Sequence, residues 1–113
     1  MPASTLAWTF LVLAGLTEIG WAVGLKYSDG FTRVGPSIAT VVGMVVSFWL
    51  LALAMRSIPL GTAYAVWTGI GAVGTVILGM LLFGESRDLL RIVCIVLIVA
   101  GIVGLKLLGG AQR

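Results

Sequence analysis

Residues 6–25 read LAWTFLVLAGLTEIGWAVGL, and Glu18 is the one ionisable side chain in this run. A helix over these residues is about 30 Å long, which matches the hydrocarbon core of a bilayer. It would place the Glu18 carboxyl near the midplane, where an ionised side chain costs between roughly 2.5 and more than 10 kcal/mol. We therefore expect this carboxyl to be either protonated or bound to a cation, and to alternate between the two.

The composition of the whole chain agrees with a membrane location. Hydrophobic residues make up 60% of the 113 residues and charged residues 10%, with a mean hydropathy of +1.19. Soluble domains are about half apolar and a quarter charged, so this composition excludes a soluble fold. The seven basic residues are scattered along the chain, which argues against a nucleic-acid-binding patch.

Four apolar segments are long enough to cross a bilayer, which takes about 20 helical residues. They predict an all-α integral membrane protein with helices at approximately 5–26, 36–55, 59–83 and 88–108. Gly30 suits a left-handed turn after the first helix, and Pro36 and Pro59 suit helix starts. Because the connections are short, successive helices should be antiparallel neighbours in one transmembrane domain over residues 1–113.

The basic residues are almost evenly divided between the two sides of the membrane. With four spans the two groups are Arg56, Lys106 and Arg113 on one side, and Lys26, Arg33, Arg87 and Arg91 on the other. Orientation normally follows a clear excess of Lys and Arg on the cytoplasmic side. The even count favours insertion in both orientations, which would let two copies form an antiparallel dimer. A single fixed orientation is the alternative.

The predicted fourth helix carries two further signals. Its fourteen uncharged residues between Arg91 and Lys106 rise only about 21 Å, less than the thickness of the bilayer core. At least one of these cations must therefore reach toward the interface or face a wet or protein-lined interior. Ala100 and Gly104 form a small-xxx-small pattern, which predicts close packing against another helix. Lipid-facing filler is the alternative interpretation.

Glu18 has candidate partners on its own helical face. Gly15 and Trp21 are each three residues away and so lie on the same side of the first helix. Gly15 would leave space near the carboxyl, and the Trp21 indole N–H could donate a hydrogen bond to it. Tryptophans of membrane proteins concentrate at the interface, so a tryptophan beside a mid-membrane acid favours a binding role.

The third helix supplies a second group of candidates. Tyr64 and Trp67 share a face, where their rings could wall a cationic ligand, although an aromatic packing stripe is the alternative. The polar Thr68 beside them favours a face directed to the interior. Gly69 and Gly71 could allow a bend that serves alternating access, and close helix packing is an equal alternative.

Ser47 and Lys106 each allow two interpretations. Ser47, deep in the second helix, could support the binding site or could bond to a backbone carbonyl four residues back. Lys106 could pair with Glu18 as a structural ion pair. We favour a functional role for Glu18, because ionisable residues inside membranes usually mark ion or substrate pathways.

The sequence predicts no enzyme, no cofactor and no metal site. It contains no histidine, and it offers no nucleophile–base constellation or cluster of metal ligands. The single cysteine, Cys94, excludes an internal disulfide, and its apolar neighbours predict a buried, unreactive thiol.

These residues together resemble a small multidrug resistance (SMR) transporter from the first helix to the end of the fourth. The shared motifs are AGLTE at 14–18, KYSDGFTR at 26–33, Pro36-Ser37, PLGTAYAVW at 59–67 and Gly84-Glu85. Within that family the chain is most similar to the guanidinium exporter subtype, through EIGWAVGLK at 18–26, WTGIGAVG at 67–74 and GIVGLK at 101–106. Exporters of polyaromatic cations typically carry a glycine in place of Trp21.

The resemblance implies a dual-topology antiparallel homodimer in the bacterial inner membrane. It would exchange protons for guanidinium or small substituted guanidinium ions at one site built by both subunits. Glu18 would bind the cation or the proton. The residues that would hydrogen-bond to Glu18 and orient it are Trp21, Ser47 and Trp67, and Tyr64 would line the portal between subunits.

Two alternatives stay open. The same fold could export quaternary ammonium or other hydrophobic cations. A different class is a non-transporting membrane scaffold in which Glu18 pairs with Lys106. Glu18→Gln separates the classes, because a transporter would lose activity but stay assembled, whereas a scaffold would lose assembly.

Overall fold

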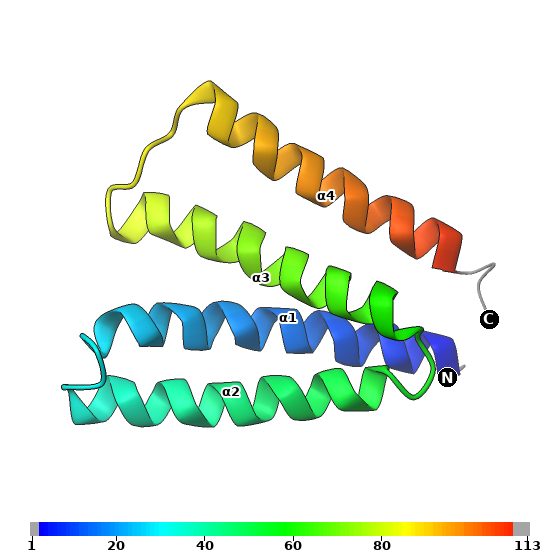
Figure 1. Ribbon diagram of the computed structural model, residues 1–113, viewed down its shortest axis with the longest axis horizontal. Helices are drawn as coiled ribbons and strands as arrows, with labels where there is room; N and C mark the ends of the chain where they lie inside the picture. Colours follow the sequence, from blue (N-terminus) through cyan, green and yellow to red (C-terminus); the bar gives the residue numbers. More distant parts are fainter. Residues whose placement is uncertain (1–2, 110–113) are drawn as a thin grey trace.

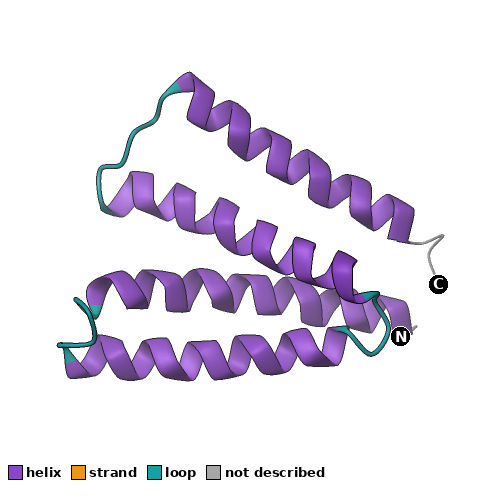
Figure 2. Cartoon of the chain, viewed as in Figure 1, coloured by secondary structure: helices purple, strands orange, loops and turns teal. Residues whose placement is uncertain are grey.

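The computed structural model describes residues 3–109, which form four α-helices joined by short loops (Figures 1 and 2). The helices are α1 (Ala3–Tyr27), α2 (Val34–Ala54), α3 (Leu60–Leu82) and α4 (Leu89–Gly109). All four are long and apolar enough to cross a membrane, which confirms the predicted all-α, four-span fold. Arg113, one of the basic residues counted for orientation, lies outside the described residues.

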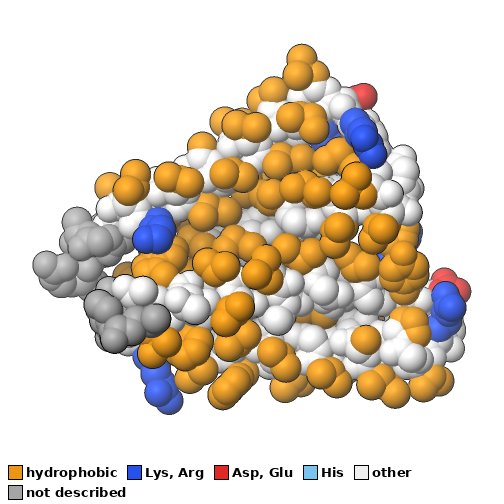
Figure 3. Space-filling view, turned by 180° about the vertical axis from the view of Figure 1, so that it is seen from behind, with side chains coloured by type: hydrophobic (Ala, Val, Ile, Leu, Met, Phe, Trp, Pro, Cys, Tyr) orange, Lys and Arg blue, Asp and Glu red, His pale blue; other side chains and the backbone are white. Residues whose placement is uncertain are grey.

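The surface of the molecule matches the membrane location. Figure 3 shows hydrophobic side chains spread over the face that it presents, with Lys and Arg at its two ends. Large apolar side chains are exposed on every helix, including Leu16, Val45, Leu81 and Leu97. Such an apolar surface suits contact with lipid tails, and a water-soluble monomer rarely exposes so large an apolar patch.

The turn between α1 and α2 is built from a left-handed backbone. Asp29, Gly30 and Phe31 have φ angles of 50°, 69° and 66°. Ser28 is fully buried and organises the turn, because its Oγ donates to the Leu25 carbonyl at 2.7 Å and accepts from the Phe31 N–H at 3.2 Å. The predicted left-handed glycine is therefore one of three consecutive residues in this conformation.

Helix α1 is the central element of the fold. It packs against α2 on one side and α3 on the other, whereas α2 and α3 touch each other only slightly. The order of the helices across the molecule is α2, α1, α3 and α4 (Figure 1). The core lies among the first three helices and consists of Ala7, Leu11, Ala14, Leu51, Ala54, Ile58, Ala63, Val66 and Trp67.

Glycines allow α1 and α3 to approach closely. A side-chain carbon at Gly15 would lie 2.6 Å from Ile70 of α3. In the opposite sense, Gly74 of α3 faces Ile19 of α1, and a side chain at Gly74 would overlap it. Each large residue fills the space that a glycine leaves on the facing helix, as in the small-residue interfaces of other membrane helices.

Helix α4 is packed differently from the other three. None of its described residues is buried, and among the helices its backbone packs only against α3. Ile98 and Ile102 contact the Gly69 position of α3, while the small Gly101 and Gly104 face open space. The helix diverges from α3 toward the loop that joins them (Figure 1). Most of its apolar surface is left for contacts outside a single chain.

Cys94 lies on this uncovered helix and is exposed, so the predicted buried thiol is wrong for the single chain. The apolar neighbours that suggested burial are themselves exposed, since Val93 is 43% and Val96 is 59% accessible. In a membrane span, apolar neighbours indicate contact with lipid as readily as they indicate a core.

Candidate functional site

The Glu18 side chain lies between α1 and α3, against Gly71. A side-chain carbon at Gly71 would overlap the Glu18 carboxyl group. One carboxyl oxygen, Oε1, is buried and has no hydrogen-bond partner within the described chain. Because an unpaired buried acceptor costs about 1–3 kcal/mol, this oxygen is suited to receive a proton or a donor from a ligand.

Trp21 presents a second buried polar group on the same face of α1. Its indole Nε1 is buried and likewise lacks a partner within the described residues. Its ring meets that of Phe48 edge-on, with centroids 6.4 Å apart and an interplanar angle of 68°. One face of α1 thus carries an unpaired acceptor, Glu18 Oε1, and an unpaired donor, Trp21 Nε1, about one helical turn apart.

Ser47 and Trp67 form a hydrogen-bond chain that joins three helices. The Trp67 Nε1–H donates to Ser47 Oγ at 2.9 Å, and Ser47 Oγ–H donates to the Ala14 carbonyl at 2.7 Å. The Thr17 hydroxyl also donates to this carbonyl, at 2.8 Å. Ala14 lies one helical turn before Glu18, so the chain fixes the backbone that carries the carboxyl.

This arrangement contradicts the interpretation in which Ser47 bonds to a carbonyl four residues back on its own helix. Its hydroxyl does not bond to its own helix, and in this structure it bonds to the backbone of α1 and to Trp67. Both Ser47 and Trp67 are buried. A direct hydrogen bond from either residue to Glu18 stays a prediction for the site with its substrate.

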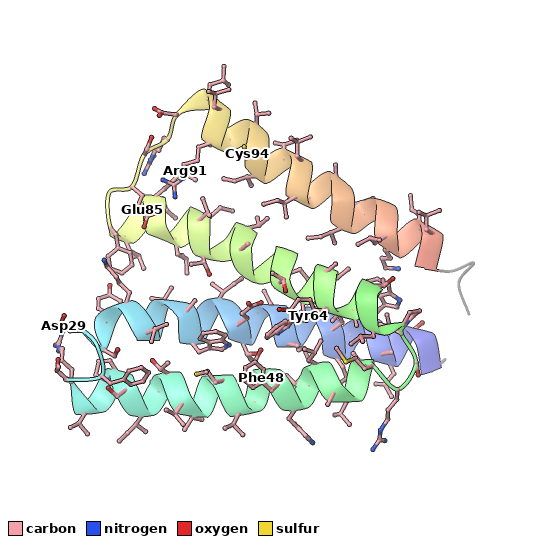
Figure 4. All side chains as sticks on the ribbon, in the orientation of Figure 1. Asp29, Phe48, Tyr64, Glu85, Arg91 and Cys94 are labelled. Atoms are coloured by element: carbon pink, nitrogen blue, oxygen red, sulfur yellow. The ribbon has the colours of Figure 1, made fainter. Side chains whose placement is uncertain are left out.

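Four aromatic rings form a row across α1, α2 and α3, in which Trp67 is buried and Phe48 is 46% exposed. Trp21, Phe48, Trp67 and Tyr64 follow one another, with centroid separations of 6.4, 5.6 and 5.6 Å. Tyr64, at the end of the row, is 55% exposed. Figure 4 labels Phe48 on α2 and Tyr64 on α3. The row begins at Trp21, one turn from Glu18, and reaches surface that a single chain leaves open at both Phe48 and Tyr64.

Phe48 is a member of this row that the sequence analysis missed. It follows Ser47 directly and contacts both predicted tryptophans. The available signal was the adjacency of an aromatic residue to the one deep serine of the second helix. That signal does not say which way the ring points.

The supporting residues have defined surroundings. The space left by Gly15 is filled by Ile70, and Gly69 faces Ile102 of α4. Helix α3 runs without interruption through Gly69 and Gly71, and both glycines admit large side chains from neighbouring helices. Thr68 is exposed on the surface of the single chain. The bend proposed for these glycines remains a prediction.

Lys106 does not pair with Glu18 within one chain. Its Nζ lies 5.1 Å from the centroid of the Trp8 ring, which is a cation–π geometry. The one ion pair in residues 3–109 joins Glu85 to Arg91, across the loop between α3 and α4 (Figure 4). The described residues also contain no group of three or more His, Cys, Asp or Glu that could hold a metal ion.

Comparison with known proteins identifies close relatives. The model of the family described as Small Multidrug Resistance protein matches residues 6–98. The chain is 65% identical over 102 residues to the guanidinium exporter of Yersinia pseudotuberculosis, covering 90% of this chain and 98% of the relative. It is 60% identical to the guanidinium exporter of Escherichia coli K12 and 57% identical to that of Proteus vulgaris. Each of these two alignments spans 102 residues and 90% of this chain, with 97% and 98% of the relative, respectively.

Proposed function

The chain belongs to the Small Multidrug Resistance family, and we propose that it exports guanidinium and small substituted guanidinium ions in exchange for protons, both competing for Glu18. Membership of this family makes it a transporter. Its four membrane-spanning helices make it a multi-pass protein of the bacterial inner membrane. The substrate follows from relatives that are named guanidinium exporters and align over nearly their whole length.

The observation that carries the proposal is the unpaired, buried Oε1 of Glu18 beside Gly71. Guanidinium is planar, stays charged at physiological pH, and presents pairs of N–H groups that match a carboxylate. Such an ion would satisfy the carboxyl and neutralise it in the same step. A proton would do the same for an empty site.

Competition at one carboxyl accounts for coupling between the two fluxes. A site that holds either the cation or protons, but not both, has two neutralised forms. In each form the site can change the side of the membrane to which it is open. The empty, ionised form is disfavoured by the cost of a charge in the bilayer. Exchange is then the favoured process, and leak through the charged form is slow.

Trp21 and Tyr64 have complementary parts in this proposal. The unpaired Trp21 Nε1 is a donor that can orient the Glu18 carboxylate, and its ring limits the size of the cation. The exposed Tyr64 lies at the end of the row of rings, which suits a portal residue. Ser47 and Trp67 hold the backbone before Glu18.

We also propose that two oppositely oriented copies form the functional dimer. Support comes from α4, which buries no described residue and leaves open space beside the small Gly101 and Gly104. Small residues on a free helical face favour close contact with another helix. The even division of basic residues allows the second copy to insert the other way up.

The test is guanidinium-driven proton movement in proteoliposomes, with wild type beside Glu18→Gln. We expect proton release that depends on guanidinium in the wild type and at least a hundredfold loss in the variant, with the dimer intact. If a quaternary ammonium ion drove proton movement and guanidinium did not, the substrate would be wrong. An intact dimer that responded to neither cation would contradict coupled antiport, and a variant that lost assembly would favour a structural role for Glu18.

A further inference from the structure

We infer that Gly43 of α2 is a positioning residue for Trp21 and thereby a determinant of cation size selectivity. The inference rests on the proposed function, in which Trp21 bounds the space beside Glu18. Gly43 faces Trp21 directly across the α1–α2 interface. A side-chain carbon at Gly43 would lie 2.9 Å from Trp21 Cβ, 3.6 Å from its Cα and 3.7 Å from its backbone N.

The atoms involved make this contact stricter than an ordinary close approach. The position of Trp21 Cβ is set by the backbone of α1, and rotation about the side-chain torsions does not move it. No change of rotamer can therefore relieve a contact at that atom. A methyl group at Gly43 requires α1 to move away from α2 at the level of Trp21.

Movement of α1 at this point would displace the indole ring. The ring contacts Phe48 at its edge, and its buried Nε1 is unpaired. Glu18 lies one turn earlier on the same face of α1. Because both residues lie on α1, the movement would carry them together relative to the other helices. It would change the contact of the indole with Phe48 of α2 and the fit of the Glu18 carboxyl against Gly71 of α3, and with them the room left for a cation. Gly43 fixes how closely Trp21 lies against α2.

The same interface contains a matched control. Gly24 of α1 faces Thr40 of α2, and a side-chain carbon at Gly24 would lie 2.8 Å from Thr40 Oγ1 and 3.7 Å from its Cα. Gly24→Ala therefore crowds the same two helices against the buried Thr40 hydroxyl, near the α1–α2 turn and away from Glu18. A general packing defect would appear in both variants, whereas an altered binding site would appear only with Gly43→Ala.

The experiment measures KM and maximal rate for guanidinium and for tetrapropylammonium in proteoliposomes of the wild type, Gly43→Ala and Gly24→Ala. We expect Gly43→Ala to raise the guanidinium KM about tenfold, with the maximal rate within about twofold, and to lower the ratio of guanidinium to tetrapropylammonium transport. Gly24→Ala should leave this ratio unchanged. Equal changes in both variants, or an unchanged guanidinium KM in Gly43→Ala, would overturn the inference and leave the proposed function standing.

A double variant shows whether Gly43 acts through Trp21. Trp21→Gly removes both the ring and the Cβ atom that Gly43 contacts, so adding Gly43→Ala to it should change neither the KM for tetrapropylammonium nor the assembly of the dimer. The same background should rescue Gly43→Ala if that variant fails to insert alone. A further change in KM, or a failure of rescue, would overturn the inference. Wild-type vesicles without guanidinium-driven proton movement would overturn the proposed function and this inference together.

Discussion

Helices α1 to α3 and helix α4 are built on opposite principles. In the first three helices, glycines on one helix accept large residues from the next, and the hydrogen-bond chain through Ser47 joins all three. Helix α4 has the highest hydropathy of the four spans, at 2.5, and none of that span is buried inside the chain. The region that carries Glu18 is thus packed within the chain, whereas the fourth span contacts the chain along one side, through residues such as Ile98 and Ile102, and leaves the rest of its surface exposed.

This difference separates two requirements of a small transporter. The Glu18 carboxyl needs a defined position, which the packed helices provide through Gly71 and through the bonds to the Ala14 carbonyl. An element that contacts a partner chain or lipid needs an exposed face that stays adaptable. In this chain of 113 residues, α1 to α3 hold the carboxyl in place and α4 provides the exposed face.

The largest effect on transport is expected from Gly71→Ala, which changes the packing of α3 against Glu18. The new methyl group would occupy the place of the Glu18 carboxyl. Because the carboxyl is at the end of a flexible side chain, it can move away, so the fold should persist. A displacement of about 1 Å can cost a hundredfold in rate, and we expect a loss of that size in guanidinium-driven proton flux.

Gly61→Ala is the matched control for this variant, because a side-chain carbon at Gly61 on the same helix meets no described atom within 4 Å. It should transport like the wild type. If Gly71→Ala also kept wild-type transport, the carboxyl would not act from the position against α3 that the structure gives it.

A smaller effect, on dimerisation, is expected from Gly104→Leu, which changes the exposed surface of α4. A side-chain carbon at Gly104 would meet no described atom within 4 Å, so the folding of the single chain should be little affected. It should weaken dimerisation about tenfold, or roughly 1.4 kcal/mol. Dimer fraction measured by energy transfer between labelled copies at increasing lipid dilution tests this.

Val103→Leu provides the comparison, since Val103 is 52% exposed beside Gly104 and the change is from one apolar side chain to another. Its dimer fraction should match that of the wild type. If Gly104→Leu gave the same dimer fraction, the face of α4 that carries Ala100 and Gly104 would be a lipid contact, and another surface would join the copies.

The smallest effect is expected from Glu85→Gln, which loosens the link between the two regions. Glu85 and Arg91 form an ion pair whose side chains are 45% and 30% exposed. Exposed pairs of this kind contribute about 1 kcal/mol or less, so thermal stability should fall only slightly and transport should stay within about twofold. Asp88→Asn removes the same charge from the same loop and is the control. A tenfold loss confined to Glu85→Gln would mean that the tie between α3 and α4 takes part in transport.

Much of the fold was predictable because hydropathy and chain length are enough to define membrane spans. The polar turn at Gly30 and the helix start after Pro59 were also visible, since each rests on the local backbone. Helix packing was not visible. In a membrane both the lipid and the protein interior are apolar, so the pattern of apolar residues hardly distinguishes the central α1 from the peripheral α4.

The candidate site shows the same division. Glu18 and Trp21 could be proposed as site residues because a carboxyl and an indole within one turn of a membrane helix are conspicuous in the sequence. Phe48 and the bond from Ser47 to the Ala14 carbonyl were not, because both depend on how two helices are aligned along their length. A one-residue shift between α1 and α2 would change these contacts and leave the sequence pattern unaltered.

The pairing of glycines with large residues also restricts how such a chain can change over generations. A side chain cannot be gained at Gly43 or Gly71 while the residue opposite keeps its size and place. The reverse order is open, because shrinking the large residue first only leaves a gap. Lineages that come to transport a different cation should therefore acquire a smaller residue at position 21 before they acquire a larger one at position 43. The two positions should vary together among descendants.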